Sequence, residues 1–473
     1  MNNYVPTIGL EIHAELKTKT KMFCDSQNNP DETRPNVNVC PICMGHPGTL
    51  PTINKEAVRQ VLRVGVAVGG TLADETEFSR KNYFYPDIPK GYQISQYAHP
   101  LVSAGTLHGF AITRVHLEED TGISLHDRGD YSLLDFNRAG VPLLELVTEP
   151  VIHSGKDASL FARELQLLLR ALSASDANME KGEMRVEANI SVNQNAEGKM
   201  QKLGTKVEVK NLNSFKAVER AIEYETKRQS VLLERGEGVT QEPRGWNEQK
   251  QETFSQRAKE ESHDYRYFPE PDLPTLRISL VPEFSTNALK KDLQELPSEK
   301  RTRYHFEGIP EAYIEMFIAN PVFAALFEQA SARVPQTKHI VANLIGTEIA
   351  GLVSQYGAGG LKHITPNGLA AVAEQYASGV LSSRGAKDAL AETFQSGGDL
   401  ADRLQKYKQQ NDAATLTGVV RKVLAENSVA VADYKKGKQS ALQYLVGACM
   451  KDMRGAGNPQ LLRDLLFEEM LRG

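Results

Sequence analysis

Apolar and polar residues alternate one by one in several short segments of the first part of the chain. Between residues 7 and 16, Ile8, Leu10 and Ile12 alternate with Glu11 and His13. Because successive side chains of a strand point to opposite faces of a sheet, this alternation predicts a strand with one apolar and one polar face. The pattern recurs over residues 112–120, 184–192 and 206–211. A polar face that recurs on several strands predicts a working surface, whereas on one strand alone it indicates only contact with water.

A helical period replaces the alternation elsewhere. Apolar residues recur every three or four positions over residues 53–68 and 157–174, which predicts two amphipathic helices. After about residue 295 the pattern is helical to the end, including the segments 439–453 and 459–471. The predicted fold class is therefore α+β, with a mixed or antiparallel sheet. Its predicted domains are a catalytic sheet domain at residues 1–294, an all-helical domain at 295–405 and a small helical tail domain at 406–473.

The composition is that of an ordinary globular protein with a net charge of −5. Its four cysteines are too few for a disulfide framework, which favours a reducing, cytoplasmic setting. The first residues lack the basic segment of a signal peptide. The most apolar stretch, residues 61–73, contains Arg63 and is too short to span a bilayer. We therefore expect a cytoplasmic protein with neither a signal peptide nor a membrane partner.

The end of the chain is mildly basic. Residues 401–473 hold 12 Lys and Arg against 8 Asp and Glu, a net charge of +4. This charge is suited to a nucleic-acid partner held at the tail. The expected contact points are Lys435, Lys436 and Lys438 and the turn at residues 455–459. The alternative is a solvated helical face, which agrees equally well with so small an excess of charge.

The densest acidic group follows His116, where Glu118, Glu119 and Asp120 are consecutive. Alternation puts Glu119 on the apolar face of its strand and puts His116 and Glu118 on the other face. An ionised carboxylate taken out of water costs several kcal/mol unless a cation or a set of donors receives it. Glu145 lies among leucines and is a second carboxylate that needs a cation or a set of donors. The pattern predicts a cation site that includes Glu119.

Aromatic and cationic residues are concentrated in residues 80–97, which hold five Tyr or Phe and three Lys or Arg. Such a loop is suited to stacking on a base while its cations contact phosphate. The three cations of this loop are Arg80, Lys81 and Lys90. A second loop of this type follows at residues 264–272, after the charged residues Arg257, Lys259 and Glu260. The alternative, an aromatic-rich structural loop, does not account for the cations.

Three of the cysteines lie close together in the sequence. Cys40 and Cys43 form a Cys-x-x-Cys pair in a loop rich in Asn and Pro, and Cys24 precedes them. Zinc held by three thiols needs a fourth ligand. The candidates for that ligand are Asp25, Asp31 and His46. The alternative is three reduced thiols in an ordered loop, because one Cys-x-x-Cys pair is a weak signal.

Common catalytic motifs are missing from the sequence. It contains neither a Gly-x-x-x-x-Gly-Lys-[Ser/Thr] phosphate loop nor a Gly-x-Ser-x-Gly nucleophile elbow. It also lacks the glycine-rich Ser-Ser run of amidases. These absences narrow the choice of reactions.

Several of these segments resemble the signature motifs of a known family, the B subunit of the tRNA-dependent amidotransferase (GatB). In the tail, residues 434–447 and 457–461 resemble that family's small C-terminal domain. The archaeal E subunit shares the core motifs but carries an inserted domain, for which this chain has no room. The motifs are residues 8–13 (IGLEIH), 80–97, 116–120 (HLEED), 136–143 (FNRAGVPL), 210–215 (KNLNSF) and 264–272 (DYRYFPEPD).

The resemblance implies a cradle-shaped catalytic domain in a complex with an amidase A subunit and a small C subunit. It implies that the B subunit uses ATP to phosphorylate the side-chain carboxylate of Glu-tRNA(Gln) or Asp-tRNA(Asn). Ammonia, released from glutamine by the A subunit and delivered through a channel, then displaces the phosphate to give Gln-tRNA or Asn-tRNA. The missing amidase motif agrees with this division of labour.

The resemblance also implies site residues. The magnesium ligands fall on Glu11, His13, Glu119 and Glu145, with Glu118 adjacent. Catalytic roles fall on these four and on Lys81 and Tyr83. Contacts to phosphate or substrate fall on Lys90, Arg138, Arg185 and Lys210. Many relatives hold zinc with a fourth cysteine, whereas this chain has Ser26 at that position, so that Asp25 would substitute or zinc would be absent.

Two other functions agree with the sequence. One is a non-catalytic tRNA-binding scaffold whose cation is structural. It would continue to support amidation after replacement of an acidic site residue. The other is a free-standing metal-dependent kinase or ligase for a small carboxylate, which would act without partner chains or tRNA.

Overall fold

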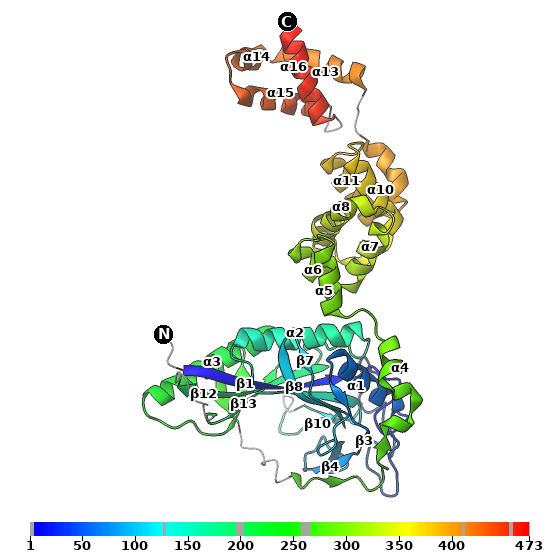
Figure 1. Ribbon diagram of the computed structural model, residues 1–473, viewed down its shortest axis with the longest axis vertical. Coiled ribbons are helices and arrows are strands. Elements are labelled where there is room, and N and C mark those ends of the chain that lie inside the picture. The colour runs from blue at the N-terminus through cyan, green and yellow to red at the C-terminus, as the bar shows by residue number, and fades with distance from the viewer. Residues whose placement is uncertain are drawn as a thin grey trace. The chain divides into compact units, whose positions relative to one another are not determined.

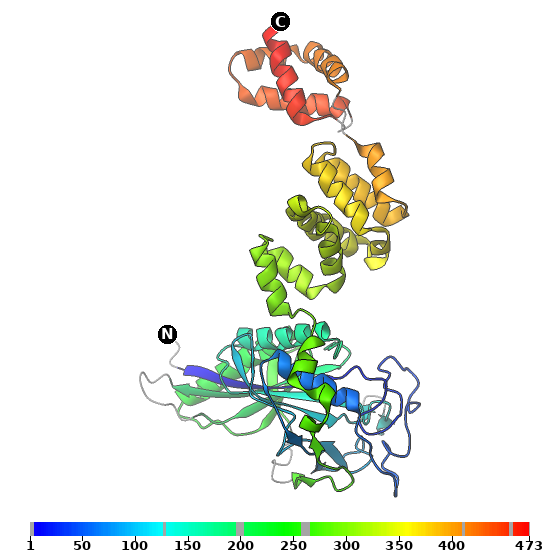
Figure 2. The same cartoon turned by 45° about the vertical axis from the view of Figure 1, so that its right-hand side comes forward.

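The computed structural model describes residues 4–125, 129–194, 203–256, 265–408, 412–453 and 457–472. The chain divides into two compact units, Met1–Pro297 and Ser298–Gly473 (Figures 1 and 2). The first unit contains the described strands of the large sheet, and the second is helical. The α+β fold class predicted from the sequence is therefore confirmed.

A ten-stranded sheet forms the centre of the first unit, in the order β15-β14-β13-β12-β1-β11-β8-β6-β2, with β7 beside β8. Among the described strands, only β13 and β14 pair in parallel, so the sheet is mixed but mainly antiparallel. Its strands are β1 (Tyr4–Glu15), β2 (Thr71–Leu72), β6 (Val102–Ser103), β7 (Thr106–Leu107), β8 (Phe110–Glu119), β11 (Pro142–Thr148), β12 (Met184–Gln194), β13 (Val207–Leu212), β14 (Pro243–Asn247) and β15 (Glu252–Ser255).

Helices cover one face of this sheet and small sheets lie on the other side (Figure 1). The helices are α1 (Lys55–Ala67), α2 (Gly155–Ala171) and α3 (Phe215–Glu234), and a short α4 (Thr286–Lys291) packs on α1. The small sheets are β16 (Phe268–Pro269) with β4 (Ser79–Asn82) and β5 (Tyr92–Ser95), β9 (Ile123–Leu125) with β10 (Leu133–Asp135), and β3 (Glu75–Thr76) with β17 (Leu276–Arg277).

The alternation in β1 explains this layering. Ile8, Leu10 and Ile12 are completely buried in the core that the helices share with the sheet. Glu11 and His13 point to the opposite face, because neighbouring side chains of a strand point in opposite directions. The predicted helices at 53–68 and 157–174 correspond to α1 and α2, which begin after the capping residues Asn54 and Ser154. The polar face of the large sheet is thus left for a site.

The second unit contains two separate hydrophobic clusters, one within residues 304–404 and one within residues 416–470. The predicted domain boundary at residue 405 falls between them and stays a prediction. None of the described helices is long and apolar enough to cross a membrane. The helices are α5 (Pro297–Phe306), α6 (Glu311–Ala319), α7 (Pro321–Ser331), α8 (Lys338–Asn343), α9 (Ala350–Tyr356), α10 (Pro366–Ala377), α11 (Ser383–Ser396), α12 (Leu400–Arg403), α13 (Ala413–Glu426), α14 (Ser428–Lys435), α15 (Gln439–Asp452) and α16 (Pro459–Arg472).

The contact between α2 and α3 generates a prediction about stability. A Cβ atom added to Gly155 would lie 2.5 Å from the backbone oxygen of Glu219 in α3, so one of the two helices would have to move. We expect Gly155→Ala to lower the free energy of unfolding by about 1–3 kcal/mol. The single tryptophan, Trp246, contacts Tyr224 of α3, so that its fluorescence during urea unfolding reports on this unit.

Gly238→Ala is the matched control, because no atom lies within 4 Å of the added Cβ. We expect that change to shift the urea midpoint only slightly. Equal midpoints for both variants would contradict the close approach of α2 and α3.

Candidate functional site

Strand register brings two histidines to one glutamate on the polar face of the large sheet. His13 of β1 lies opposite Glu145 of β11, and Glu145 lies opposite His116 of β8. Directly opposed residues have Cβ atoms about 4.5–5.5 Å apart, so their side chains can meet. The Nε2 atoms of His13 and His116 lie 3.4 Å and 3.3 Å from the same Glu145 oxygen. Glu145 is therefore the common partner of both rings.

Two further carboxylates complete this group. His13 Nε2 lies 3.5 Å from Glu118 Oε1 and 3.7 Å from Glu11 Oε1. Two overlapping sets could each hold a metal ion, and they share Glu145: Glu11 with His13 and Glu145, and His116 with Glu118 and Glu145. We refer to the five residues Glu11, His13, His116, Glu118 and Glu145 as the carboxylate–imidazole cluster.

The cluster fits a divalent cation on the evidence of its own atoms. Glu118 Oε2 and His116 Nδ1 are buried without a hydrogen-bond partner among the described residues. A buried polar atom without a partner costs roughly 1–3 kcal/mol, and more when it is charged. Carboxylate oxygens are the ligands that magnesium prefers. The three carboxylates of the cluster therefore suit magnesium.

Protonation of the cluster follows from its crowding. Burial alone would lower the pKa of His13, but the carboxylates of Glu145, Glu118 and Glu11 outweigh burial and raise that pKa to about 9. Burial and the neighbouring Glu145 raise the pKa of Glu11 to about 7. For Glu145, the two imidazoles outweigh burial and hold its pKa well below the usual range. In the metal-free protein, a charged His13 thus compensates the buried carboxylates.

Glu119 lies outside this cluster, although the family resemblance implied it as a magnesium ligand together with Glu11, His13 and Glu145. That ligand role stays a prediction. Its Oε1 atom lies 2.5 Å from Lys90 Nζ and accepts a hydrogen bond of 2.9 Å from the Ile94 backbone. The alternation correctly put Glu119 on the apolar side of β8, but the cation on that side is the Lys90 ammonium. Glu118, expected only to be adjacent, instead faces the cluster.

A cavity of about 380 Å³ lies beside the cluster. Its lining includes seven of the residues predicted from the sequence: Glu11, His13, Lys81, Tyr83, Glu118, Arg185 and Lys210. Its other charged lining residues include Asp120 and Glu187. The predicted residues Lys90 and Arg138 do not line this cavity. The cavity therefore brings cationic side chains next to the carboxylate–imidazole cluster.

Acidic partners hold two of the cavity's cations in place. Arg185 donates a hydrogen bond of 2.8 Å to Asp120 Oδ2, and Lys210 lies 2.5 Å from Glu187 Oε2. Arg138 approaches Asp120 Oδ2 at 3.5 Å and donates to the Thr121 and Gly122 carbonyls from outside the cavity. These contacts orient the guanidinium and ammonium groups before any ligand arrives.

The two aromatic and cationic loops come together over the cavity. The Tyr83 and Tyr265 ring centroids are 5.6 Å apart, and Lys81 Nζ lies 5.2 Å from the Tyr265 ring. Tyr83 also donates a hydrogen bond of 2.8 Å to Gln93. Burial lowers the pKa of Lys81, but Glu118 and other nearby groups outweigh it and raise that pKa well above the ordinary value. Lys81 therefore stays charged. Arg257, Lys259, Glu260 and Asp264 lie outside the described residues.

Sequence reasoning gave no site role to three residues that the structure brings to the cluster or the cavity: His116, Asp120 and Glu187. The alternation already contained a signal for two of them. His116 shares the polar face of β8 with Glu118, and Glu187 alternates with apolar residues along β12. Which polar residues on neighbouring strands meet depends on strand register, which the alternation does not encode.

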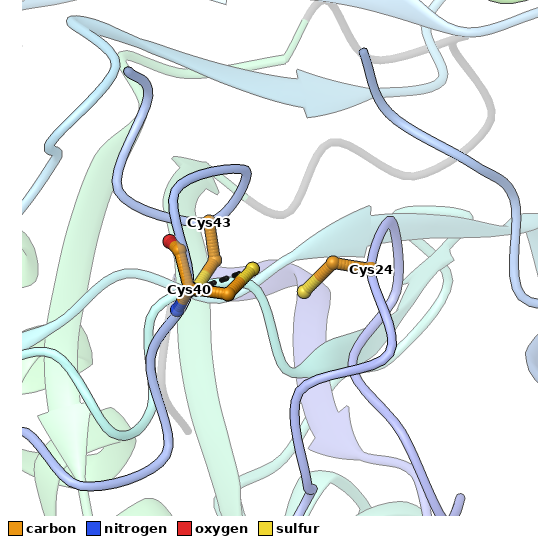
Figure 3. A group of neighbouring side chains, drawn as sticks. All are labelled: Cys24, Cys40 and Cys43. Atoms are coloured by element: carbon orange, nitrogen blue, oxygen red, sulfur yellow. Dashed lines mark hydrogen bonds between the residues drawn. The ribbon is translucent and has the colours of Figure 1, made fainter. Parts of the chain in front are cut away.

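The three cysteine thiols form a separate cluster. Their sulfur atoms lie within 4.8 Å of one another and come from two segments of one loop (Figure 3). The three candidates for a fourth ligand do not join them: Asp25 and His46 are exposed, and Asp31 pairs with Lys181 at 2.9 Å.

The raised pKa of His13 generates a prediction about pH. A group whose pKa rises on folding stabilises the folded state fully below its unfolded pKa, and this stabilisation is lost as pH rises through the folded pKa. We expect the free energy of unfolding of the metal-free wild-type protein to be higher than that of the His13→Gln variant, by on the order of 2–3 kcal/mol near pH 6. The difference should decline between pH 6.5 and about 9.

Urea unfolding followed by Trp246 fluorescence at several pH values, with a chelator present, measures this difference. His108→Asn is the control, because His108 is exposed and Asn tolerates its positive φ of 49°. A difference for His13→Gln that stays constant across this pH range would contradict the assigned charge.

Two family models and several known proteins match this chain. The model of the GatB/GatE catalytic domain family matches residues 6–281, and the model of the GatB domain matches residues 325–470. A relative from Caldanaerobacter subterraneus is 42% identical and another from Thermus thermophilus is also 42% identical, each over 99% of this chain and 99% of its own length. A third, from Crocosphaera subtropica, is 38% identical over 99% of this chain and 98% of its own. All three are named as the B subunit of aspartyl/glutamyl-tRNA(Asn/Gln) amidotransferase, and the chain described here belongs to this GatB family.

Proposed function

We propose that this chain is the B subunit of a tRNA-dependent amidotransferase. In this proposal it uses ATP to phosphorylate the side-chain carboxylate of Glu-tRNA(Gln), Asp-tRNA(Asn) or both, and ammonia then displaces the phosphate. The observation that carries the proposal is the carboxylate–imidazole cluster beside the cationic cavity residues Lys81, Arg185 and Lys210. Membership of the GatB family and the names of the relatives support it.

Glu11, His13, Glu118 and Glu145 are the proposed magnesium-binding residues. Bound magnesium supplies positive charge to nucleotide phosphates and to the carboxylate that is being activated. Glu118 replaces Glu119 in this set because its buried Oε2 atom lacks a partner among the described residues, whereas Glu119 pairs with Lys90. His13 has to lose its proton before it can bind a cation. Cation affinity should therefore increase with pH toward 9.

The cations of the cavity have a separate role in the proposal. Phosphoryl transfer is catalysed mainly by positioning and by electrostatic stabilisation of negative charge. Lys81, Arg185 and Lys210 line the cavity and can contact phosphate oxygens or the substrate carboxylate. Tyr83 and Tyr265 offer aromatic faces on which a base can stack. Arg138 acts indirectly, through its contact with Asp120. Lys90 acts indirectly, through its contact with Glu119.

The proposed complex contains an amidase A subunit and a small C subunit. The missing amidase motif supports a division in which another chain releases ammonia from glutamine. We further propose a cytoplasmic location, in line with the low cysteine content. The proposal includes both Glu-tRNA(Gln) and Asp-tRNA(Asn) as substrates, because the nucleotides that distinguish the two tRNAs are not part of this chain.

The main test compares Glu118→Gln with Glu119→Gln in a complex co-expressed with the A and C subunits. We expect Glu118→Gln to reduce tRNA-dependent ATP cleavage on the order of 100-fold or more, since it removes a proposed ligand of the charge-stabilising cation. Glutaminase activity of the A subunit should be largely retained. Amidation of Glu-tRNA(Gln) and Asp-tRNA(Asn) is assayed in parallel.

Manganese binding distinguishes the role of Glu118 from that of Glu119. Its affinity should decrease in Glu118→Gln and stay near the wild-type value in Glu119→Gln, whose carboxylate pairs with Lys90. Normal ATP cleavage by Glu118→Gln, with only a lower melting temperature, would favour the scaffold function instead. Activity on a free carboxylate without partner subunits would favour the kinase or ligase.

Helices α13–α16 are proposed to hold the tRNA. Their apolar residues form one cluster, so a deletion within α14 would disrupt the fold and the cut belongs before α13. We expect deletion of residues 412–473 to raise the KM for tRNA with little change in kcat, because long-range charge acts mainly on association. A milder variant replaces Lys435 and Lys436 by Gln. Gly455 and Ala456 of the predicted contact turn lie outside the described residues.

The measurement is the KM for tRNA at several salt concentrations. Removing positive charge should flatten the salt dependence of binding. An unchanged KM and an unchanged salt slope for both variants would exclude the tail from tRNA binding.

A further inference from the structure

Lys21 and Ser26 lie close to the cysteine cluster, which consists of Cys24, Cys40 and Cys43. The Ser26 hydroxyl oxygen lies 3.9 Å from Cys43 Sγ, and Lys21 Nζ lies 3.7 Å from the same sulfur. A hydroxyl oxygen and an ammonium group therefore lie beside the same thiol.

The spacing of the sulfurs fits a single zinc ion. Zinc–sulfur bonds of about 2.3 Å in a tetrahedron separate the sulfur atoms by about 3.8 Å. The sulfurs of Cys40 and Cys43 are 3.9 Å apart, and all three sulfurs lie within 4.8 Å of one another (Figure 3). Ser26 lies at a similar distance from Cys43, so its oxygen is near enough to share an ion with that sulfur.

Lys21 presents an electrostatic problem that the thiols can resolve. Its side chain is completely buried, and its ammonium donates hydrogen bonds to Cys43 Sγ and, at 3.2 Å, to the Phe136 carbonyl. Within the part of the chain that the structure describes, no carboxylate forms an ion pair with it. A buried ammonium without an anionic partner is costly. The cysteine cluster is the available source of negative charge.

The charges of the thiolates, the zinc ion and Lys21 sum to zero. Three thiolates and one zinc ion carry a net charge of −1, and the Lys21 ammonium brings the buried site to zero. We propose that Lys21 and Ser26 together replace the missing fourth thiolate, with Ser26 Oγ completing the zinc coordination and Lys21 neutralising the three-thiolate complex. Each cysteine releases its proton when the ion binds. A neutral hydroxyl binds zinc more weakly than a thiolate, so this zinc exchanges more readily than zinc in a four-cysteine site.

The zinc site stabilises a loop that supports the catalytic region. Besides the contact between Lys21 and Phe136, Asn137 Oδ1 accepts hydrogen bonds of 2.8 Å from the backbone of Val37 and of Asn38. The cysteine loop is thereby joined to the segment that precedes Arg138. This inference does not depend on the proposed reaction, because it concerns the binding of zinc alone.

The test measures zinc affinity of the full chain by competition with a chromophoric chelator, with elemental analysis of the bound metal. Wild-type protein should bind one zinc ion at this site. Lys21→Met should weaken binding roughly 10- to 100-fold, the usual effect of losing a group that supports a metal ligand. Lys19→Met is the matched control, since Lys19 is exposed on the same segment, and it should bind as wild type does.

Ser26 variants test the fourth ligand independently, in case Lys21→Met does not fold. Ser26→Ala should weaken zinc binding, and Ser26→Cys should strengthen it at least tenfold and slow its exchange. In the cobalt-substituted protein, the thiolate-to-metal charge-transfer absorption should correspond to three thiolates in wild type and four in Ser26→Cys. Unchanged affinity in both Lys21→Met and Ser26→Ala, or wild-type protein that binds no zinc when zinc is supplied, would overturn the proposal.

Discussion

Buried carboxylates are the constraint on which this catalytic unit depends. The large sheet carries Glu118, Glu119 and Glu145 at positions that are almost inaccessible to water. Each must have a cation or a set of donors nearby, because an unpaired buried charge costs far more than the few kcal/mol by which domains are stable. The arrangement of histidines, lysines and arginines around the sheet is the answer to that requirement. The cationic residues of the site are therefore also needed for the fold to be stable.

The two faces of the sheet meet this requirement differently. On the apolar side, Glu119 has a permanent ammonium partner in Lys90 and a backbone donor in Ile94, so its charge is already compensated. On the polar side, several carboxylates share two imidazoles, and Glu118 retains an oxygen without a partner among the described residues. The first arrangement is complete without a ligand. The arrangement on the polar side retains a carboxylate oxygen that is available to a cation. This is the difference between a structural ion pair, on the apolar side, and a binding site, on the polar side.

Alternation in the sequence was sufficient to predict the strands, the two faces and several site residues. It identified Glu11, His13 and Glu145 because each interrupts or opposes an apolar pattern. It singled out Glu119 rather than Glu118 as the carboxylate that needs a cation, but it could not identify that cation as Lys90, which is 29 positions from Glu119 in sequence. The pairing of His116 with Glu145 depends on strand register, which the alternation does not encode. The approach of Lys21 and Ser26 to Cys43 arises from loop folding, for which no periodic pattern exists.

The position of β1 has a consequence for the synthesis of the protein. This strand is made before the other described strands, yet it lies in the interior of the sheet, between β11 and β12. Its register partners include Val147 and Gln194, so almost two hundred residues must be translated before both of its edges are covered. At usual rates of translation this takes roughly 10–40 s. During that time the nascent chain carries an apolar strand with open edges, and it is exposed to aggregation until β12 arrives.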